Sequence, residues 1–379
     1  MFNVFDVLLA IAVSFTITFL AIPAIITVAH RKKLFDIPDE RKVHQSPIPS
    51  LGGLGIFASF VIACLLSIQF QYAPEIQYFL AASLVIFFLG LKDDILVISP
   101  IKKFIGQVMA AFLIIYKGGI QIKSMHGFMG IGELPEMFSL LFTYLTVLVI
   151  INSFNLIDGI DGLAGSLGLM ASVIFGIYFF QANIIAYSIL SFALAGSLVA
   201  FLIFNFQPAK IFMGDTGSML IGMVNAILVI KFINVGGVSA IHIPVSAAPA
   251  IGFSILMIPL LDTLRVFGIR IIHRRSPFSP DRNHIHHLML DLGLNHRAIT
   301  LILVAVNFAF IVATFALRNL GCTPLILGII ASFFAGIAIL YYARPRPRLF
   351  VARQGASSSK LTKSRVLPLT EESILEQKN

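Results

Sequence analysis

Charged residues are scarce in this sequence. Asp, Glu, Lys and Arg make up 12% of its 379 residues, against about 25% in soluble globular domains. The hydrophobic fraction is 58% and the mean hydropathy is +0.94. These values exclude an ordinary water-soluble protein. Length alone would allow two or three domains, but apolar segments recur along almost the whole chain, which predicts one helical membrane domain.

Cysteine is also rare, because only Cys64 and Cys322 are present. Two cysteines exclude a disulfide framework and a cysteine metal site. The first apolar stretch, 7–29, lacks the basic region and the small-residue cleavage site of a signal peptide. A stretch of this length crosses about 30 Å of hydrocarbon at about 1.5 Å per residue. We therefore expect a retained first helix.

Eleven apolar segments are candidate membrane spans. We expect all of them to be helices, because an open sheet cannot satisfy its backbone hydrogen bonds in lipid. The expected fold is an all-α polytopic membrane protein. The candidate spans are 7–29, 51–70, 78–91, 104–116, 137–152, 163–182, 184–204, 217–233, 247–264, 299–317 and 323–342.

The basic residues predict the orientation. With eleven spans, 23 of the 27 Lys and Arg residues fall on the side of the loops at 30–50, 92–103 and 265–298 and of the C-terminal tail. The positive-inside rule places that side in the cytoplasm and the N-terminus outside. The net charge of +9 therefore indicates membrane orientation and not nucleic-acid binding. We expect a transmembrane domain at 1–345 and a disordered basic cytoplasmic tail at 346–379.

A pair of adjacent carboxylates, Asp93 and Asp94, follows an apolar run. Two such groups repel each other near a low-dielectric boundary unless a cation is close. Lys102 and Lys103 follow about ten residues later and are candidates for that cation or for a phosphate ligand. The alternative is an interfacial charge cluster that only stops translocation.

Oxygen-bearing side chains recur every three residues at Asn152, Asn155, Asp158 and Asp161. Neighbours in this series could share a helix face, and the two Asp-Gly steps favour turns. The segment 153–162 contains no Lys or Arg, so its acids lack a local salt-bridge partner. Uncompensated oxygens suit a hard cation such as Mg²⁺. The alternative is two ordinary turns at helix ends.

A further acid, Asp215, lies between Gly214 and Gly217 just before an apolar segment. A carboxylate in that place could be a helix cap. Capping leaves the rest of the unusual segment 204–218 unexplained, so we favour a metal ligand.

Three of the nine histidines, His284, His286 and His287, fall within four residues, in the arginine-rich segment 274–287. Histidine-rich tracts suggest zinc, but no cysteine or second histidine pair has zinc-like spacing. Arginine beside histidine fits a diphosphate better, because guanidinium binds phosphate oxygens bidentately. A solvated basic loop is the alternative.

One acid, Asp262, lies near the end of an apolar segment, three residues before Arg265. Carboxylates inside membrane segments are often functional. A structural ion pair at this spacing is an adequate explanation, and we prefer it.

These segments, in this order and on one side of the membrane, resemble the polyprenyl-phosphate N-acetylhexosamine-1-phosphate transferases. The resemblance covers roughly residues 1–345 and extends to 36–39, 41–44 and 49–53. It implies transfer of a sugar phosphate from a UDP-N-acetylhexosamine to polyprenyl phosphate, with release of UMP, at the cytoplasmic face of a bacterial inner membrane. The His-Ile-His-His form at 284–287 resembles the N-acetylglucosamine-1-phosphate branch. The peptidoglycan sibling, which transfers phospho-MurNAc-pentapeptide, is the alternative.

The resemblance implies roles for individual residues. The paired aspartates are linked to activation of the lipid phosphate, Lys103 to phosphate binding and Asp161 to the uracil. The catalytic candidates are Asp93, Asp94, Asp158, His284, His286 and His287. The substrate-binding candidates are Lys103, Asn152, Asp161 and Arg282. The candidate ligands of Mg²⁺, or of Mn²⁺, are Asn155 and Asp215. Eukaryotic relatives carry an asparagine where this chain has Val97, which argues against a metal ligand there.

Other functions fit the sequence less well. A secondary transporter would place its charges near the bilayer midplane and often shows repeated halves, and no repeat is visible here. In CDP-alcohol phosphatidyltransferases, Ala-Arg follows two residues after the first Asp-Gly. The chain has Gly165-Ser166 in that place. The sugar, the lipid length, the pathway, a homodimer and the choice between one displacement and a covalent intermediate stay open.

Overall fold

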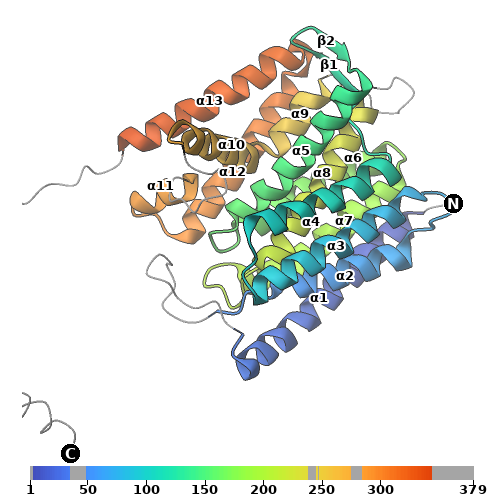
Figure 1. The fold of residues 1–379 in the computed structure, drawn as a ribbon, viewed down its shortest axis with the longest axis vertical. Coiled ribbons are helices and arrows are strands. Elements are labelled where there is room, and N and C mark those ends of the chain that lie inside the picture. The colour runs from blue at the N-terminus through green and yellow to red at the C-terminus, as the bar shows by residue number, and fades with distance from the viewer. Residues whose placement is uncertain (1–2, 35–47, 238–244, 246, 275–283, 344–379) are drawn as a thin grey trace, which may run out of the picture. The chain divides into compact units, whose positions relative to one another are not determined.

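The fold class expected from the apolar segments is confirmed in the computed structural model. The structure describes residues 3–34, 48–237, 245, 247–274 and 284–343, all within the unit Met1–Arg344. The predicted tail at 346–379 lies outside the described residues, as do the segment 36–44 and Arg282. The described part of the chain is almost entirely helical (Figure 1).

The elements follow one another in a simple order. The first helices are α1 (Val4–Lys32), α2 (Gly52–Ser67), α3 (Glu75–Ile95), α4 (Pro100–Phe112) and the π-helical turn η1 (Leu113–Lys117). Two strands follow, β1 (Ser124–Phe128) and β2 (Ile131–Glu133). Then come α5 (Glu136–Ile157), α6 (Leu163–Gln181), α7 (Ile185–Asn205), α8 (Gly214–Gly236), α9 (Ala248–Ile255) and α10 (Met257–Ile272). The last are α11 (Ile285–Asp291), α12 (His296–Ala316), the short 3-10 turn η2 (Arg318–Leu320) and α13 (Cys322–Ala343).

Every expected span coincides with helical structure. In the described residues, eight helices are long and apolar enough to cross a membrane, and α2 is a shorter apolar helix. The expected span 104–116 corresponds to α4 together with η1. The number of segments that cross the bilayer, and their orientation, stay predictions.

The ninth expected span, 247–264, is not one continuous helix. It is interrupted at Leu256, between α9 and α10. Pro259 lies in the first turn of α10, where its missing N–H costs no helical hydrogen bond. Asn307 of α12 satisfies the freed backbone groups: its Oδ1 accepts from Ile258 N at 3.1 Å, and its Nδ2 donates to Ile255 O at 3.1 Å. A side chain from another helix therefore stabilises the break.

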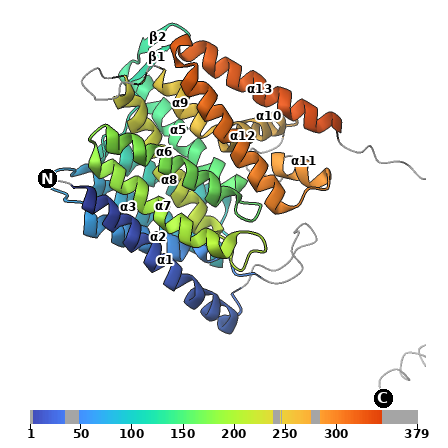
Figure 2. The same cartoon turned by 180° about the vertical axis from the view of Figure 1, so that it is seen from behind.

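Two local elements differ from the expectation. The loop between η1 and α5 contains the antiparallel pair β1–β2, whose two turn residues, Met129 and Gly130, both have positive φ, as in tight hairpin turns. The histidine segment, expected as a loop, forms the helix α11 from Ile285 onward. Figures 1 and 2 show α11 and the β1–β2 hairpin at opposite ends of the helices.

Helix α8 is the centre of the packing. In its most apolar window 78% of the residues are buried, against 17% in α13. Glycines let two neighbouring backbones reach its first turn. A Cβ at Gly90 of α3 would lie 2.4 Å from Thr216 Cα, and a Cβ at Gly53 of α2 would lie 2.3 Å from Gly217 N. The end of α3 is therefore held directly against the start of α8.

Candidate active site

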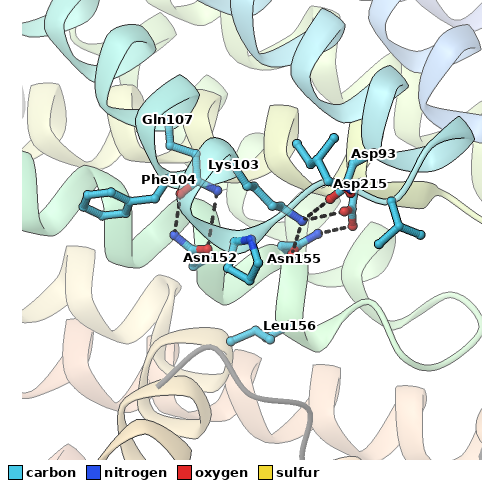
Figure 3. Close-up of a pocket in the computed structure, with 11 residues that line it drawn as sticks. Asp93, Lys103, Phe104, Gln107, Asn152, Asn155, Leu156 and Asp215 are labelled. Atoms are coloured by element: carbon cyan, nitrogen blue, oxygen red, sulfur yellow. Dashed lines mark hydrogen bonds and ion pairs between the residues drawn. The ribbon is translucent and has the colours of Figure 1, made fainter. Parts of the chain in front are cut away.

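Four polar side chains from four helices meet beside this junction. Lys103 of α4 places Nζ 3.1 Å from Asp93 Oδ2 of α3 and 2.5 Å from Asp215 Oδ2 of α8. The same Nζ donates to Asn155 Oδ1 of α5 at 3.1 Å. Asn155 in turn donates through Nδ2 to Asp215 Oδ1 at 2.5 Å. We call Asp93, Lys103, Asn155 and Asp215 the lysine cluster (Figure 3).

The second of the paired aspartates has a different position. Asp94 Oδ1 accepts from the backbone N–H of Asp215 at 2.7 Å. Its Oδ2 accepts from Thr216 N at 3.1 Å and from Thr216 Oγ1 at 2.6 Å. A carboxylate on exposed N–H groups at a helix start is a favourable cap. Asp94 is thus the cap of α8, and the Asp215 side chain is left for the lysine cluster.

A cavity of about 340 Å³ opens beside the lysine cluster. Asn152 contributes to one wall, where its Nδ2 donates to Gln107 Oε1 at 2.8 Å. Gln107 lies one helical turn after Lys103 on α4 and was not predicted from the sequence, although polar residues four apart on an apolar helix share a face. The cavity is lined by Asp93, Val97, Ile98, Pro100, Lys103, Phe104, Gln107, Asn152, Asn155, Leu156 and Asp215.

The lysine cluster fits a divalent cation by its donor set. Three oxygens, from Asp93, Asn155 and Asp215, surround one positive charge, which the chain itself supplies as Lys103 Nζ. Carboxylate and amide oxygens are the ligands that Mg²⁺ prefers, and Mg²⁺ usually takes its remaining ligands from water and substrate phosphate. Across the described ranges, no three His, Cys, Asp or Glu residues form a metal-binding group on their own. The amide oxygen of Asn155 is therefore needed to complete the set.

The loop after α5 holds the other two predicted acids. Asp158 follows the last residue of α5. Burial raises the pKa of its carboxyl well above the usual range, and the charges of Asp215 and Asp94 raise this pKa further. Leu156, two residues earlier, lines the cavity beside the lysine cluster, so the loop begins next to the cluster.

Asp161 is only 3% exposed and its contacts are with protein groups. Its Oδ1 lies 3.2 Å from His296 Nδ1, and its Oδ2 accepts from Ala209 N at 3.4 Å. Asp161 is not among the residues that line the cavity, so its predicted contact with uracil stays a prediction. The partner of Asp161 is therefore not local, because His296 belongs to α12.

The three histidines at the start of α11, His284 just before the helix and His286 and His287 within it, lie against the same loop. His284 and His286 stack, with ring centroids 5.6 Å apart and planes 5° from parallel, and His287 lies 4.4 Å from His286. A Cβ at Gly159 would lie 2.9 Å from His286 Nε2. Burial, followed by the nearby His287, lowers the pKa of His286 to about 3. His286 is thus a neutral ring next to the Asp158–Gly159 turn.

Gly159→Ala tests this contact. The added methyl group would meet His286 Nε2 at 2.9 Å, closer than ordinary van der Waals contact, and would displace the ring. We expect turnover to fall by about tenfold, the effect of a small misplacement in an active site. Turnover and melting temperature of the purified protein check this, with Gly336→Ala of α13 as control, because an added Cβ there meets nothing within 4 Å. Unchanged turnover in a folded Gly159→Ala protein would show that the contact is irrelevant.

The segment 49–53, which belongs to the resemblance seen in the sequence, supports the start of α8. Gly52 N donates to Phe212 O at 2.9 Å, and Gly53 N donates to Met213 O at 2.8 Å. These bonds fix the chain just before Asp215. The structure therefore brings the lysine cluster, Asp158 and the histidines of α11 to one end of the helices, and Arg282 stays untested.

Comparisons with known proteins indicate the family of the chain. The family model described as glycosyl transferase family 4 matches residues 76–233. The decaprenyl-phosphate N-acetylglucosaminephosphotransferase of Mycobacterium leprae is 33% identical over 309 residues, which are 76% of this chain and 77% of the relative. The undecaprenyl-phosphate alpha-N-acetylglucosaminyl 1-phosphate transferase of Pasteurella multocida is 34% identical over 346 residues, 88% of this chain and 91% of the relative.

A third relative is more distant. The probable undecaprenyl-phosphate N-acetylglucosaminyl 1-phosphate transferase of Bacillus subtilis is 30% identical over 321 residues, 82% of this chain and 86% of the relative. All three relatives are matched over more than three quarters of this chain. The chain therefore belongs to glycosyl transferase family 4, as an enzyme that transfers sugar phosphate groups in a membrane.

Proposed function

We propose that the chain transfers N-acetylglucosamine 1-phosphate from UDP-N-acetylglucosamine to a polyprenyl phosphate, with release of UMP. The observation that carries this proposal is the lysine cluster: two carboxylates, one amide and one ammonium from four helices meet beside a cavity of about 340 Å³. The printed names of the relatives supply the sugar and the lipid. They favour this branch over the phospho-MurNAc-pentapeptide branch.

The reaction exchanges one phosphorus–oxygen bond for another. An oxygen of the polyprenyl phosphate attacks the phosphorus that carries the sugar. The bond from that phosphorus to the UMP oxygen breaks, and UMP leaves with the bonding electrons. The product is polyprenyl-diphospho-N-acetylglucosamine. Because both reactants are anions, the main task of the site is charge neutralisation and alignment.

The residues of the lysine cluster can divide this work. Lys103 Nζ is the cation that neutralises phosphate oxygens and draws the two reactants together. Asp93, whose Oδ1 accepts from Ile98 N at 2.9 Å, accepts a proton from the lipid phosphate. Asp94 places Asp215 by capping α8.

A polyprenyl tail has an apolar surface beside the site. The α3–α4 turn exposes Ile95, Leu96 and Val97, and Val97 also lines the cavity. Next to the phosphate-binding groups, these side chains favour a lipid acceptor over a water-soluble one. The positive-inside distribution of Lys and Arg supports the cytoplasmic face of a bacterial plasma membrane as the side of the site.

Magnesium is part of the proposal. Asp215 and Asn155, with Asp93, would hold the ion, and Mg²⁺ would supply charge neutralisation at the diphosphate as UMP leaves. We expect EDTA to lower transfer by at least about 100-fold, in line with the several kcal/mol that such an ion contributes. Activity should return on addition of Mg²⁺ or Mn²⁺ and not of Ca²⁺, which prefers longer bonds and more ligands. Full activity in EDTA would contradict the metal assignment.

Product analysis tests the function as a whole. The purified protein is incubated with radiolabelled UDP-N-acetylglucosamine, UDP-N-acetylgalactosamine or UDP-MurNAc-pentapeptide, each with and without undecaprenyl phosphate. When undecaprenyl phosphate is present, we expect equal amounts of UMP and lipid-linked sugar phosphate from UDP-N-acetylglucosamine, and neither product from the other two sugar nucleotides. A burst of UMP without the lipid would indicate a covalent intermediate. Uptake into proteoliposomes without turnover would instead indicate a transporter.

A further inference from the structure

Asp262 of α10 is a buried carboxylate outside the lysine cluster. Its exposed fraction is 0%. One contact is the ion pair expected from the sequence, in which Arg265 Nη2 donates to Asp262 Oδ1 at 2.9 Å. This pair accounts for only part of the geometry, because His284 and Ile285 contact the two oxygens as well.

The contacts from α11 fix the first histidine of the segment. Ile285 N donates to Asp262 Oδ1 at 2.9 Å, and His284 Nδ1 lies 2.8 Å from Asp262 Oδ2. His284 is the residue before α11, and its own side chain does not cap that helix. Asp262 therefore holds the start of α11 from outside and sets the orientation of the His284 ring.

The bond between Asp262 and His284 has a chemical consequence. A carboxylate accepts hydrogen bonds and does not donate them, so the Nδ1 of His284 carries a proton. The other ring nitrogen, Nε2, is then the atom left for a ligand. Because a carboxylate partner on one nitrogen fixes both the tautomer and the ring plane, the orientation extends to His286, which stacks on His284.

We propose that Asp262 is a positioning residue for the transfer reaction, holding His284 through Nδ1–H so that Nε2 meets the diphosphate of the donor. This inference rests on the proposed function for the identity of the ligand. The Asp262–His284 bond itself does not depend on it. Asp262 does not touch the reactants, and it acts through His284.

Asp262→Asn changes the partner of His284 and nearly preserves the shape. The Asn oxygen can still accept from Ile285 N, but the amide N–H₂ then faces His284 Nδ1. The proton is thereby shifted to Nε2 of His284. We expect turnover to fall on the order of 10- to 100-fold, the effect seen for outer partners of ligand-binding histidines.

A double-mutant cycle separates positioning from structural support. If Asp262 acts through His284, Asp262→Asn should add less than about threefold to the loss caused by His284→Ala, because the two changes remove the same interaction. The control is Asn307→Ala, which weakens the α9–α10 break and leaves His284 untouched. Its effect should multiply with that of His284→Ala. Multiplicative effects for Asp262 would overturn the proposal.

Nitrogen NMR provides a readout besides activity. In protein labelled with ¹⁵N-histidine, the His284 signals, assigned with His284→Gln, should show a protonated Nδ1 in the wild type. In Asp262→Asn the proton should move to Nε2. If Asp262→Asn fails to fold, the wild-type spectrum still decides, because an unprotonated Nδ1 would overturn the proposal. Absence of transfer by a wild type that shows protonated Nδ1 would instead contradict the proposed function.

Discussion

Asp215→Ala is expected to lower sugar-phosphate transfer on the order of 1,000-fold while the protein stays folded. The carboxylate contacts both Lys103 and Asn155, so its loss removes a ligand of the proposed Mg²⁺ and releases the cation of the cluster. Losing one preorganised electrostatic group commonly lowers turnover by about 100- to 1,000-fold. Losing a metal ligand should have a similar effect, because the metal ion also stabilises the negative charge of the transition state. Folding should persist because Asp94 caps the backbone N–H of residue 215, which alanine keeps.

The measurement is transfer of radiolabelled sugar phosphate by purified protein, beside a melting curve in the same detergent. Glu133→Ala is the matched control, since it removes an exposed acid from β2, at the other end of the helices. It should leave transfer unchanged. A folded Asp215→Ala protein with more than one tenth of wild-type turnover would refute the assignment of Asp215.

Lys103→Met is expected to cost both activity and stability. Methionine keeps the apolar stem but removes the ammonium that lies between Asp93 and Asp215. The two carboxylates then face each other without a cation between them. We expect the free energy of unfolding to fall by about 2 kcal/mol, between the values for exposed and for fully buried ion pairs. Turnover should fall at least about 100-fold, because the phosphate loses its cation.

Added Mg²⁺ distinguishes these two effects. If the three oxygens of the cluster form a cation site, Mg²⁺ should raise the melting temperature of Lys103→Met more than that of the wild type, since no ammonium competes for the oxygens. Transfer should not recover, because the phosphate contact is still missing. The account would be contradicted by a variant that regains wild-type turnover in Mg²⁺, or by one that Mg²⁺ does not stabilise at all.

Much of the fold could be predicted from the sequence. Long apolar segments can satisfy their backbone only as helices in lipid, and every expected span coincides with helical structure. The break at Leu256 could not be predicted, because Asn307, which satisfies the freed backbone groups, lies 49 residues from Ile258. The β1–β2 hairpin could not be predicted either. It lies in the loop between two apolar segments, and the hydropathy of a loop does not distinguish a hairpin from irregular structure.

The site could be predicted in its residue types but not in its pairing. Asp93, Lys103, Asn155 and Asp215 were all expected, and the structure brings them together. The partners were not visible, because Lys103 and Asp215 are 112 residues apart. Asp93 joins the lysine cluster whereas Asp94 caps α8. This difference depends on Gly90, which lets α3 approach α8 closely. No local pattern shows that Asp94 caps a helix that begins more than a hundred residues later.

The most direct test of the central claim is an experimental structure with UDP-N-acetylglucosamine and Mn²⁺ bound, with the metal located by its anomalous signal. We predict Mn²⁺ within bonding distance of Asp215 and Asn155, about 2.0 to 2.2 Å from their oxygens, and Lys103 Nζ on a phosphate oxygen. We also predict the diphosphate between the lysine cluster and α11. A diphosphate bound at the hairpin end of the helices, or a metal that none of these oxygens contacts, would contradict the account.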